Sequence, residues 1–509
     1  MKLTSRKQKM MINTIVSALS EIVSMICGLI LPRLILSHYG SSYNGTISSI
    51  TQMISFVTLL RAGVGGVTRA SLYKPLAEGD TEKVSAIVNA TERFMRKVAL
   101  IFVGFAVAGA CIYPFIVTDF GWMFTVVLFL TLSASTFIQY YFGITYQLLL
   151  MADQRQYIFT AVNILSIVLN TVFSAILINL GCSIIIVKLG SAVAFAITPL
   201  VIHFYVRKKY NINRSVPPDT KALEQRWDAL GHQIAYYIFT STDLTVLTFL
   251  ANVKIVSVYS VYHLPIKAVK TVIKTYSSSA EAAFGNIIAK DQKRTLRSVH
   301  EVFECFMFVS CTFLFACTAG LILPFIRIYT NQITDANYYQ PVFALLLVAG
   351  ELTYCLRIPY MTLVESSGQY RQTKRGAYVE ATINIVSSVV LCFLIEPLVA
   401  VAIGTLLGLL IRTIEISRYT DRNIVNRSRL RFYLNLLASY SVLVIVYIIA
   451  GKLPYTNGCS TYVQWAGLAL LTAVIVSGVI GVYCIIFYKD TTVEMIKMVK
   501  STILRKKAR

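Results

Sequence analysis

The sequence predicts an all-α, polytopic membrane protein from three observations: its composition, its hydropathy and the recurring length of its apolar segments. Of 509 residues, 56% are apolar and only 14% charged, and the mean hydropathy is +0.66. A soluble domain carries about 25% charged residues. A bilayer core about 30 Å thick needs about 20 mostly apolar residues in a spanning helix. These numbers exclude a soluble enzyme, a disordered chain, a collagen and a coiled coil.

Fourteen segments are predicted as membrane-spanning helices from their length and apolar character. They cover residues 12–36, 44–66, 95–117, 122–150, 157–180, 183–206, 230–251, 256–284, 302–326, 341–365, 376–396, 397–416, 433–451 and 463–488. The first is interpreted as a helix and not as a cleaved signal peptide, because Glu21 interrupts it, its apolar stretch passes Pro32 and it lacks a clear small-residue cleavage site.

The distribution of Lys and Arg predicts the orientation of the helices. Alternate loops hold 36 of these residues, whereas the opposite loops hold only Lys254, Arg327 and Lys452. Because positive loops stay in the cytoplasm, both termini are predicted to be cytoplasmic. The net charge of +23 then reflects this bias and contact with anionic lipids, not nucleic acid. The basic tail 489–509 is predicted to form an amphipathic helix on the cytoplasmic membrane surface.

A weak internal repeat predicts the domain organisation. The letters YPFI at 113–116 return as LPFI at 323–326, and VNILS at 162–166 returns as INIVS at 383–387. The common order and similar offset predict two six-helix lobes related by a parallel pseudo-twofold axis, with a C-terminal helix pair appended. The predicted parts are an N-terminal lobe 1–206, a cytoplasmic linker 207–229, a C-terminal lobe 230–417, and a region 418–509 with the helix pair and tail.

Basic residues inside the predicted spans are the main functional signal, because each costs at least about 2.5–3.5 kcal/mol near the bilayer centre. Lys188 and Arg412 lie near helix ends, where snorkelling explains them. The others, with the neighbouring His263 and Arg69, form the predicted substrate-binding set. This set is Arg33, Arg61, Arg69, His263, Lys267, Lys270, Lys274 and Arg357.

The most specific pattern in this set is a basic stripe in the segment 256–284. His263, Lys267, Lys270 and Lys274 follow i, i+4, i+7 and i+11 spacing, which places them on one helical face. Like charges this close need water and counter-anions, and such groups suit phosphate or pyrophosphate oxygens. The alternative is a cytoplasmic loop, or lysines that hold lipid phosphates at the membrane rim. Pro265 is expected to disrupt the backbone bonding within the stripe.

The repeat offset places Arg61 level with the stretch 270–274, so both lobes are expected to present cations to one hydrated cavity. Three intramembrane acids, Glu21, Asp243 and Glu351, are candidates for H⁺ or Na⁺ coupling or for charge partners of the bases. The partner interpretation is favoured. Enzyme motifs such as HExxH and GxSxG are absent, and the ten cysteines stand singly. No catalytic residue, metal or cofactor is predicted.

Three segments resemble a known family. GLILPRLILSHYGSSYNGTISSI at 28–50, RAGVGGVTRA at 61–70 and LAEGDTEKV at 76–84 resemble the Wzx-type polysaccharide flippases of the multidrug/oligosaccharidyl-lipid/polysaccharide exporter superfamily. The resemblance implies a two-lobed exporter in the bacterial inner membrane. It would move undecaprenyl-pyrophosphate-linked oligosaccharides from the cytoplasmic to the outer leaflet. Fourteen helices are shared with some flippases, including the peptidoglycan-precursor branch.

The residues lead to the same hypothesis, because a hydrated cationic cavity open to lipid would hold a pyrophosphate head while the tail stays in the bilayer. The expected partners are this lipid-linked glycan, anionic lipids and a coupling ion. The alternatives are a lipid II flippase and a cation-coupled multidrug exporter of the same architecture. A glycan polymerase or ligase is disfavoured, because such enzymes typically carry a large outer loop and the outer loops here are short.

Overall fold

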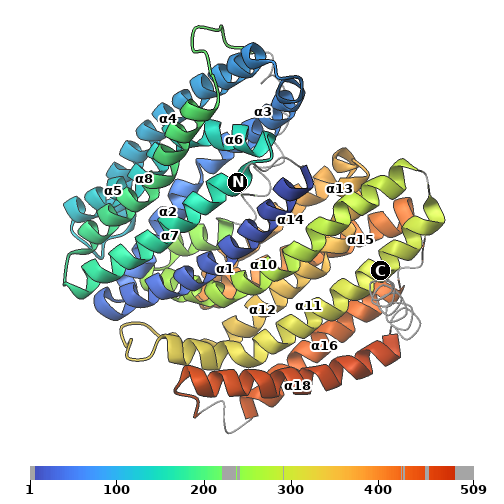
Figure 1. Ribbon diagram of the computed structural model, residues 1–509. Helices are drawn as coiled ribbons and strands as arrows, with labels where there is room; N and C mark the ends of the chain where they lie inside the picture. The colour runs from blue at the N-terminus through green and yellow to red at the C-terminus, as the bar shows by residue number, and fades with distance from the viewer. Residues whose placement is uncertain are drawn as a thin grey trace. The chain divides into compact units, whose positions relative to one another are not determined.

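The structure is a computed structural model that describes residues 6–220, 237, 241–290, 292–425, 427, 430–452 and 458–487. The described residues form helices joined by short loops and contain no strand (Figure 1). The elements are α1 (Arg6–Tyr39), α2 (Ser41–Ser55), α3 (Thr58–Glu78), α4 (Thr81–Ile116), α5 (Trp122–Ile138), η1 (Gln139–Gly143), α6 (Ile144–Ala152), α7 (Gln156–Asn179), α8 (Ile184–Lys209), α10 (Val253–Ala289), α11 (Lys293–Tyr329), α12 (Pro341–Leu356), α13 (Ile358–Ser366), α14 (Tyr370–Cys392), α15 (Pro397–Thr420), η3 (Asp421–Val425), α16 (Leu430–Lys452) and α18 (Tyr462–Phe487). The predicted all-α fold is confirmed.

Ten helical segments of the described chain are long and apolar enough to cross a membrane. Together they make the chain a multi-pass membrane protein. They coincide with ten of the fourteen predicted spans. Of the other four, 44–66 is divided between α2 and α3, while 256–284 and 376–396 are the more polar helices α10 and α14. Of 230–251, the described part contains a short apolar helix, Ser241–Leu250, whereas residues 230–236 and 238–240, like the tail 489–509, lie outside the described residues.

Local backbone breaks occur where the sequence analysis expected continuous helices. The predicted span 44–66 is interrupted at Phe56–Val57, and the span 341–365 is divided at Arg357, two residues before Pro359. Pro359 then lies in the first turn of α13, where its missing amide donor is tolerated. In contrast, α10 continues through Pro265, so the expected disruption does not end the helix. The proline removes its own amide donor, and the rest of the helix is retained.

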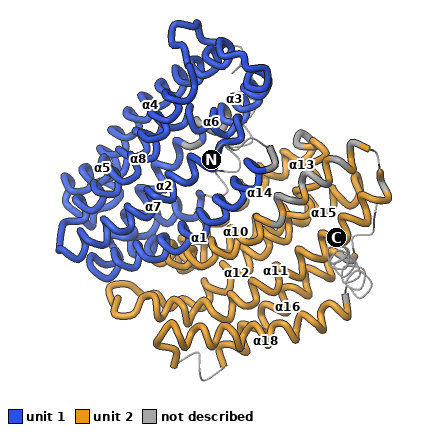
Figure 2. Tube along the Cα trace, viewed as in Figure 1, with its two compact units in different colours: residues 1–257 blue, residues 258–509 orange. Residues whose placement is uncertain are grey.

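The chain divides into two compact units, residues 1–257 and 258–509 (Figure 2). The order of long and interrupted helices recurs within them. The long helices α4 and α11 both contain a proline near their C-terminal ends, Pro114 and Pro324. Each is followed by an interrupted segment, α5–η1–α6 in one case and α12–α13 in the other, and then by a helix pair. The two-lobed organisation that the sequence analysis derives from the repeat stays a prediction.

The described part of the predicted linker is held against unit 1. The Asn89 side chain of α4 donates hydrogen bonds of 3.0 Å to the carbonyls of Asn213 and Val216. The amide of Asp219 donates to the carbonyl of Ala86 at 3.1 Å. These contacts anchor the chain after α8, up to residue 220.

A pair of glycines allows the close approach of α14 and α15 in unit 2. Gly404 and Gly408 are four residues apart, so they lie on one face of α15. A Cβ on Gly404 would lie 2.2 Å from Ser388 Oγ and 2.8 Å from the Ser388 amide nitrogen. A Cβ on Gly408 would lie 3.0 Å from the carbonyl oxygen of Glu380. Small residues at this spacing let membrane helices pack backbone to backbone.

We predict that Gly404→Val lowers the thermal stability of the detergent-purified protein, because overpacking a tight contact costs roughly 1–3 kcal/mol. The matched control is Gly467→Val in α18, where no atom lies within 4 Å of the added Cβ. Unfolding is followed with a thiol-reactive dye, since Cys305 and Cys355 are buried. Equal melting temperatures for the two variants would show that α14 and α15 do not pack as described.

Candidate functional site

The basic stripe lies on α10 as the spacing predicts, but its members have different environments. Lys267 and Lys274 are exposed. Lys270 is partly buried, and its Nζ lies 2.6 Å from Glu351 Oε2 on α12. Within the described chain, neither Lys267 nor Lys274 forms an ion pair. The stripe therefore contains one neutralised lysine between two lysines that face solvent or membrane headgroups.

Three of the cations lie close to one aromatic ring, that of Tyr354. The Nζ of Lys270 lies 4.4 Å from the Tyr354 ring centroid, the Nζ of Lys274 lies 5.9 Å from it, and the Arg357 guanidinium carbon lies 5.2 Å from it. Cations within about 6 Å of a ring face are attracted to its quadrupole by about 0.5–2 kcal/mol. We call these four residues and Glu351 the Tyr354 cluster. It holds three positive charges close together beside one carboxylate.

Arg357 continues this cluster into a buried ionic chain. Its Nη1 donates to Glu380 Oε1 at 2.6 Å, and the other Glu380 oxygen lies 3.9 Å from Arg412 Nε. Arg412 also contacts Glu415 and donates to the carbonyl of Thr373 at 3.0 Å. Both arginines and Glu380 are less than a tenth exposed. The prediction that Arg412 snorkels is therefore wrong, because its side chain is buried and pairs with Glu380 of α14.

Lys188 also does not snorkel, since only 7% of it is exposed. It lies four residues after Ile184, which is 1% exposed, and next to the fully buried Val187. Residues four apart share a helical face, and this face of α8 packs into the apolar core of unit 1. The position of Lys188 near a helix end predicted snorkelling, but this position alone does not tell which face of the helix the residue lies on.

The remaining predicted site residues do not join the Tyr354 cluster in the described contacts. His263 stacks on Tyr259 with ring centroids 4.3 Å apart, and its buried Nε2 has no hydrogen-bond partner. Arg33 and Arg69 are half-buried in unit 1, where Arg69 Nε donates to the Gly65 carbonyl at 3.2 Å. The side chain of Arg61 lies outside the described residues.

The three predicted acids have three different environments. Glu21 is exposed on α1, and Asp243 is only 7% exposed in the helix Ser241–Leu250. Glu351 is the acid paired with Lys270. The convergence of bases from both lobes on one cavity, and any ion-coupling role of these acids, remain predictions.

A second ionic cluster joins α11, α13 and η3. Arg427 contacts Glu304, and its Nε donates to Asp421 Oδ1 at 2.7 Å. Glu304 accepts a further hydrogen bond of 2.5 Å from the Tyr360 hydroxyl. Burial lowers the pKa of the Arg427 guanidinium, but Glu304, Tyr360 and Asp421 together raise this pKa above its usual value, so Arg427 stays charged. Arg427 thus links α11 and η3, and the Tyr360–Glu304 hydrogen bond joins α13 to them.

Sequence reasoning missed Tyr354, Glu380 and the Arg427 cluster. A signal for the first was present, because Glu351, Tyr354 and Arg357 are spaced by three residues and share one face of a helix. Glu380 and the Glu304–Arg427 pair carried no such signal, since these partners lie on different helical elements, 23 residues or more apart. Among the described residues, no group of three or more His, Cys, Asp or Glu side chains is arranged to hold a metal ion.

Comparison with known proteins identifies the fold class. No family model and no curated protein matches the sequence. A solved structure of the lipid II flippase MurJ in an inward closed conformation matches with a TM-score of 0.64 and 14% identity, over 94% of this chain and 98% of MurJ. An inward-facing MATE family transporter of the MOP superfamily matches with a TM-score of 0.62 and 14% identity, over 79% of this chain and 94% of the transporter.

The Vibrio cholerae MATE transporter VcmN in its bent form matches more weakly, with a TM-score of 0.53 and 11% identity, over 87% of this chain and 98% of VcmN. The chain therefore has the fold of MOP-superfamily transporters. At these identities the likeness concerns the fold alone. The similar proteins are transporters and flippases, not enzymes.

We predict that Arg427→Ala destabilises the protein by roughly 3–5 kcal/mol, because it leaves the Glu304 and Asp421 carboxylates buried without their cation. The control is Arg297→Ala, which removes the exposed Arg297–Glu301 pair and should cost at most about 1 kcal/mol. Thermal unfolding of the purified variants measures both effects. If the first variant unfolds no earlier than the second, the buried cluster does not stabilise the fold.

Proposed function

We propose that this protein is a flippase that moves undecaprenyl-pyrophosphate-linked oligosaccharide units from the cytoplasmic to the outer leaflet of a bacterial inner membrane. The observation that carries the proposal is the Tyr354 cluster together with the exposed Lys267. It is a concentration of cations on helices of a transporter fold, with fewer carboxylates than cations in contact with it. This balance of charge suits an anionic cargo.

The chemistry of the cargo follows from the arrangement of these cations. A pyrophosphate carries several oxygens that accept charge-assisted hydrogen bonds. Lys267 and Lys274 are exposed and form no ion pair in the described residues, so they are available to a ligand. A lipid-linked pyrophosphate needs such cations for its head, while its polyprenyl tail stays in the bilayer. A free sugar without charge would not need them.

The paired cations divide into a structural and an exchangeable group. Arg357 and Arg412 are buried against Glu380 and stabilise the packing of α12, α14 and α15. Lys270 is about a quarter exposed and its partner Glu351 is 13% exposed. We propose that cargo pyrophosphate displaces Glu351 from Lys270. When no cargo is bound, Glu351 neutralises Lys270, which avoids an uncompensated charge at membrane depth.

The proposal includes the domain organisation predicted from the repeat, with lobes 1–206 and 230–417 and both termini in the cytoplasm. In this arrangement Arg33, Arg61 and Arg69 supply the cations of the N-terminal lobe, and rocking of the lobes gives alternating access. The recurrence of helix lengths and breaks in the two halves supports it. The sugar composition and the coupling ion are left open by these residues.

A cation exporter with the same fold is the second candidate, because Asp243 supplies a buried carboxylate in unit 1. Such an exporter would require an acidic binding face, whereas the described face of α10 is basic. The two candidates are distinguished by cargo. The flippase translocates lipid-linked pyrophosphate in the presence of a cationic dye, and the exporter loses dye transport when the acid is replaced.

We predict that Lys270→Ala with Lys274→Ala abolishes translocation and leaves membrane insertion intact. The measurement is leaflet-resolved movement of undecaprenyl-pyrophosphate oligosaccharide in proteoliposomes. The control is Lys74→Ala with Lys83→Ala, which removes two lysines near the α3–α4 turn and should translocate normally. Normal transport by the first double variant would refute the assignment of the cationic site.

We also predict that Glu351→Gln strengthens binding of a short-chain polyprenyl pyrophosphate about fivefold, equivalent to roughly 1 kcal/mol. The amide no longer competes with pyrophosphate for Lys270. Titration calorimetry of the purified protein measures the affinity, and Glu301→Gln on α11 is the control. Unchanged affinity combined with loss of gradient-driven transport would instead assign Glu351 to ion coupling.

A further inference from the structure

A small cavity at one end of unit 2 is separate from the Tyr354 cluster. It lies where α11 and α16 end and where α12 begins, and its volume is about 180 Å³. That is far more than the roughly 10–15 Å³ that one water molecule needs. It is less than the 300 Å³ or more of a typical site for a drug-sized ligand. The cavity therefore suits a group the size of a lipid headgroup.

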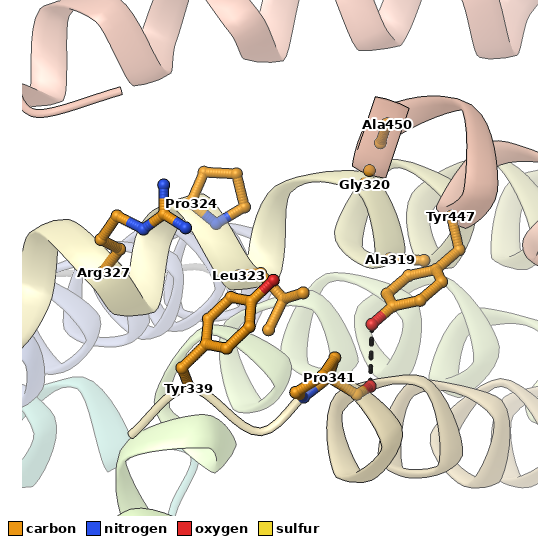
Figure 3. Close-up of a pocket in the computed structure, with 10 residues that line it drawn as sticks. Ala319, Gly320, Leu323, Pro324, Arg327, Tyr339, Pro341, Tyr447 and Ala450 are labelled. Atoms are coloured by element: carbon orange, nitrogen blue, oxygen red, sulfur yellow. Dashed lines mark hydrogen bonds between the residues drawn. The ribbon is translucent and has the colours of Figure 1, made fainter. Parts of the chain in front are cut away.

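Three polar side chains from different segments reach this cavity, as Figure 3 shows. Arg327 comes from the last turn of α11, and its guanidinium carbon lies 5.6 Å from the ring centroid of Tyr339 in the loop before α12. The Tyr447 hydroxyl of α16 donates to the carbonyl of Pro341 at 2.8 Å. This bond fixes the start of α12 against α16. Arg327 is the charged residue among those that line the cavity.

Small residues on α11 and α16 create the space. A Cβ on Gly320 would lie 3.2 Å from Ala450 Cβ, so the two helices pack closely at that level. One residue further along α16, Gly451 lines the cavity, and no atom lies within 4 Å of the position its Cβ would take. The cavity is therefore open where a side chain on α16 would otherwise project.

The distribution of Lys and Arg in the sequence bears on the ligand of this cavity. The loops predicted to lie on the side opposite the lysine-rich loops contain Lys254, Arg327 and Lys452 as their only Lys and Arg residues. Arg327 lines the cavity, and Lys452 directly follows Gly451. On a side that is predicted to have few bases, an arginine in the cavity wall with a lysine next in sequence to another lining residue indicates an anionic ligand.

Neighbouring aromatic residues place the cavity at the level of lipid headgroups. Trp465 Nε1 donates to the Leu321 carbonyl at 3.2 Å, and its ring packs 5.8 Å from Phe325, which stacks on Tyr329. Trp and Tyr gather at membrane–water interfaces. Further along α18, Leu470 and Val474 are at least 70% exposed and provide an apolar surface for acyl chains.

We propose that this cavity binds the phosphate of a lipid headgroup in the leaflet opposite the lysine-rich loops. Arg327 contacts the phosphate, Tyr339 holds the guanidinium at the rim, and the acyl or prenyl chain lies on the exposed surface of the neighbouring helices. The phosphate has two sources, a resident phospholipid or a polyprenyl carrier. The inference does not rest on the proposed cargo, because none of these residues belongs to the Tyr354 cluster.

The test is native mass spectrometry of the detergent-purified full chain with four separate probes. These are dioleoylphosphatidylglycerol, undecaprenyl phosphate, dioleoylglycerol and inorganic phosphate. We expect the two phosphate-bearing lipids to bind and the other probes to bind far more weakly. The tighter of the two lipids identifies the source. Equal binding of dioleoylglycerol, or binding of inorganic phosphate alone, would overturn the proposal.

The variants locate the bound lipid. Arg327→Gln removes the charge and should weaken binding on the order of tenfold, as expected for a lost charge-assisted hydrogen bond. Gly451→Leu places a side chain at a position where its Cβ meets no atom within 4 Å, so it should fill the space and have a similar effect. Lys254→Gln removes another base from the same side and should leave binding unchanged. Unaltered lipid binding by Arg327→Gln, with normal thermal stability, would exclude this site.

Discussion

Pairing of Glu380 with two arginines is the interaction on which the organisation of unit 2 depends. Three ionised groups lie inside apolar surroundings, where an unpartnered charge would be very unfavourable. Arg357 approaches from the α12–α13 break and Arg412 from α15, while Glu380 belongs to α14. The need to satisfy all three sets the positions of these helices. The glycine-lined contact of α14 and α15 then follows from the same close approach.

The distinction between buried and exposed cations gives the basic residues different functions. Arg357, Arg412 and Arg427 are less than a tenth exposed and have carboxylate partners. Their ion pairs therefore link helices to one another. Lys267 and Lys274 are exposed. Lys270 lies between these extremes, because its pair with Glu351 is accessible enough to exchange. A count of the basic residues in the predicted spans cannot separate the buried cations from the exposed ones. Only the exposed lysines are accessible to a ligand.

Unit 2 offers two different kinds of anion site. The Tyr354 cluster combines several cations and suits a head with high charge. The cavity between α11 and α16 holds one arginine beside aromatic and small residues, and suits a single phosphate at the membrane interface. A transporter of amphipathic lipids would meet charged headgroups at both membrane surfaces. The two sites are nevertheless independent in their residues and in their tests.

The sequence by itself determined the helical membrane fold, most of the spans and the face shared by Lys267, Lys270 and Lys274, because hydropathy and helical periodicity are local properties. The spacing of Glu351, Tyr354 and Arg357 was equally local. Only the tertiary structure decided that Glu351 neutralises Lys270, that Lys188 and Arg412 point inward, and that Glu304 meets Arg427. Those outcomes depend on which faces of different helices meet, between residues that are far apart in the sequence. Local patterns carry no information about such contacts.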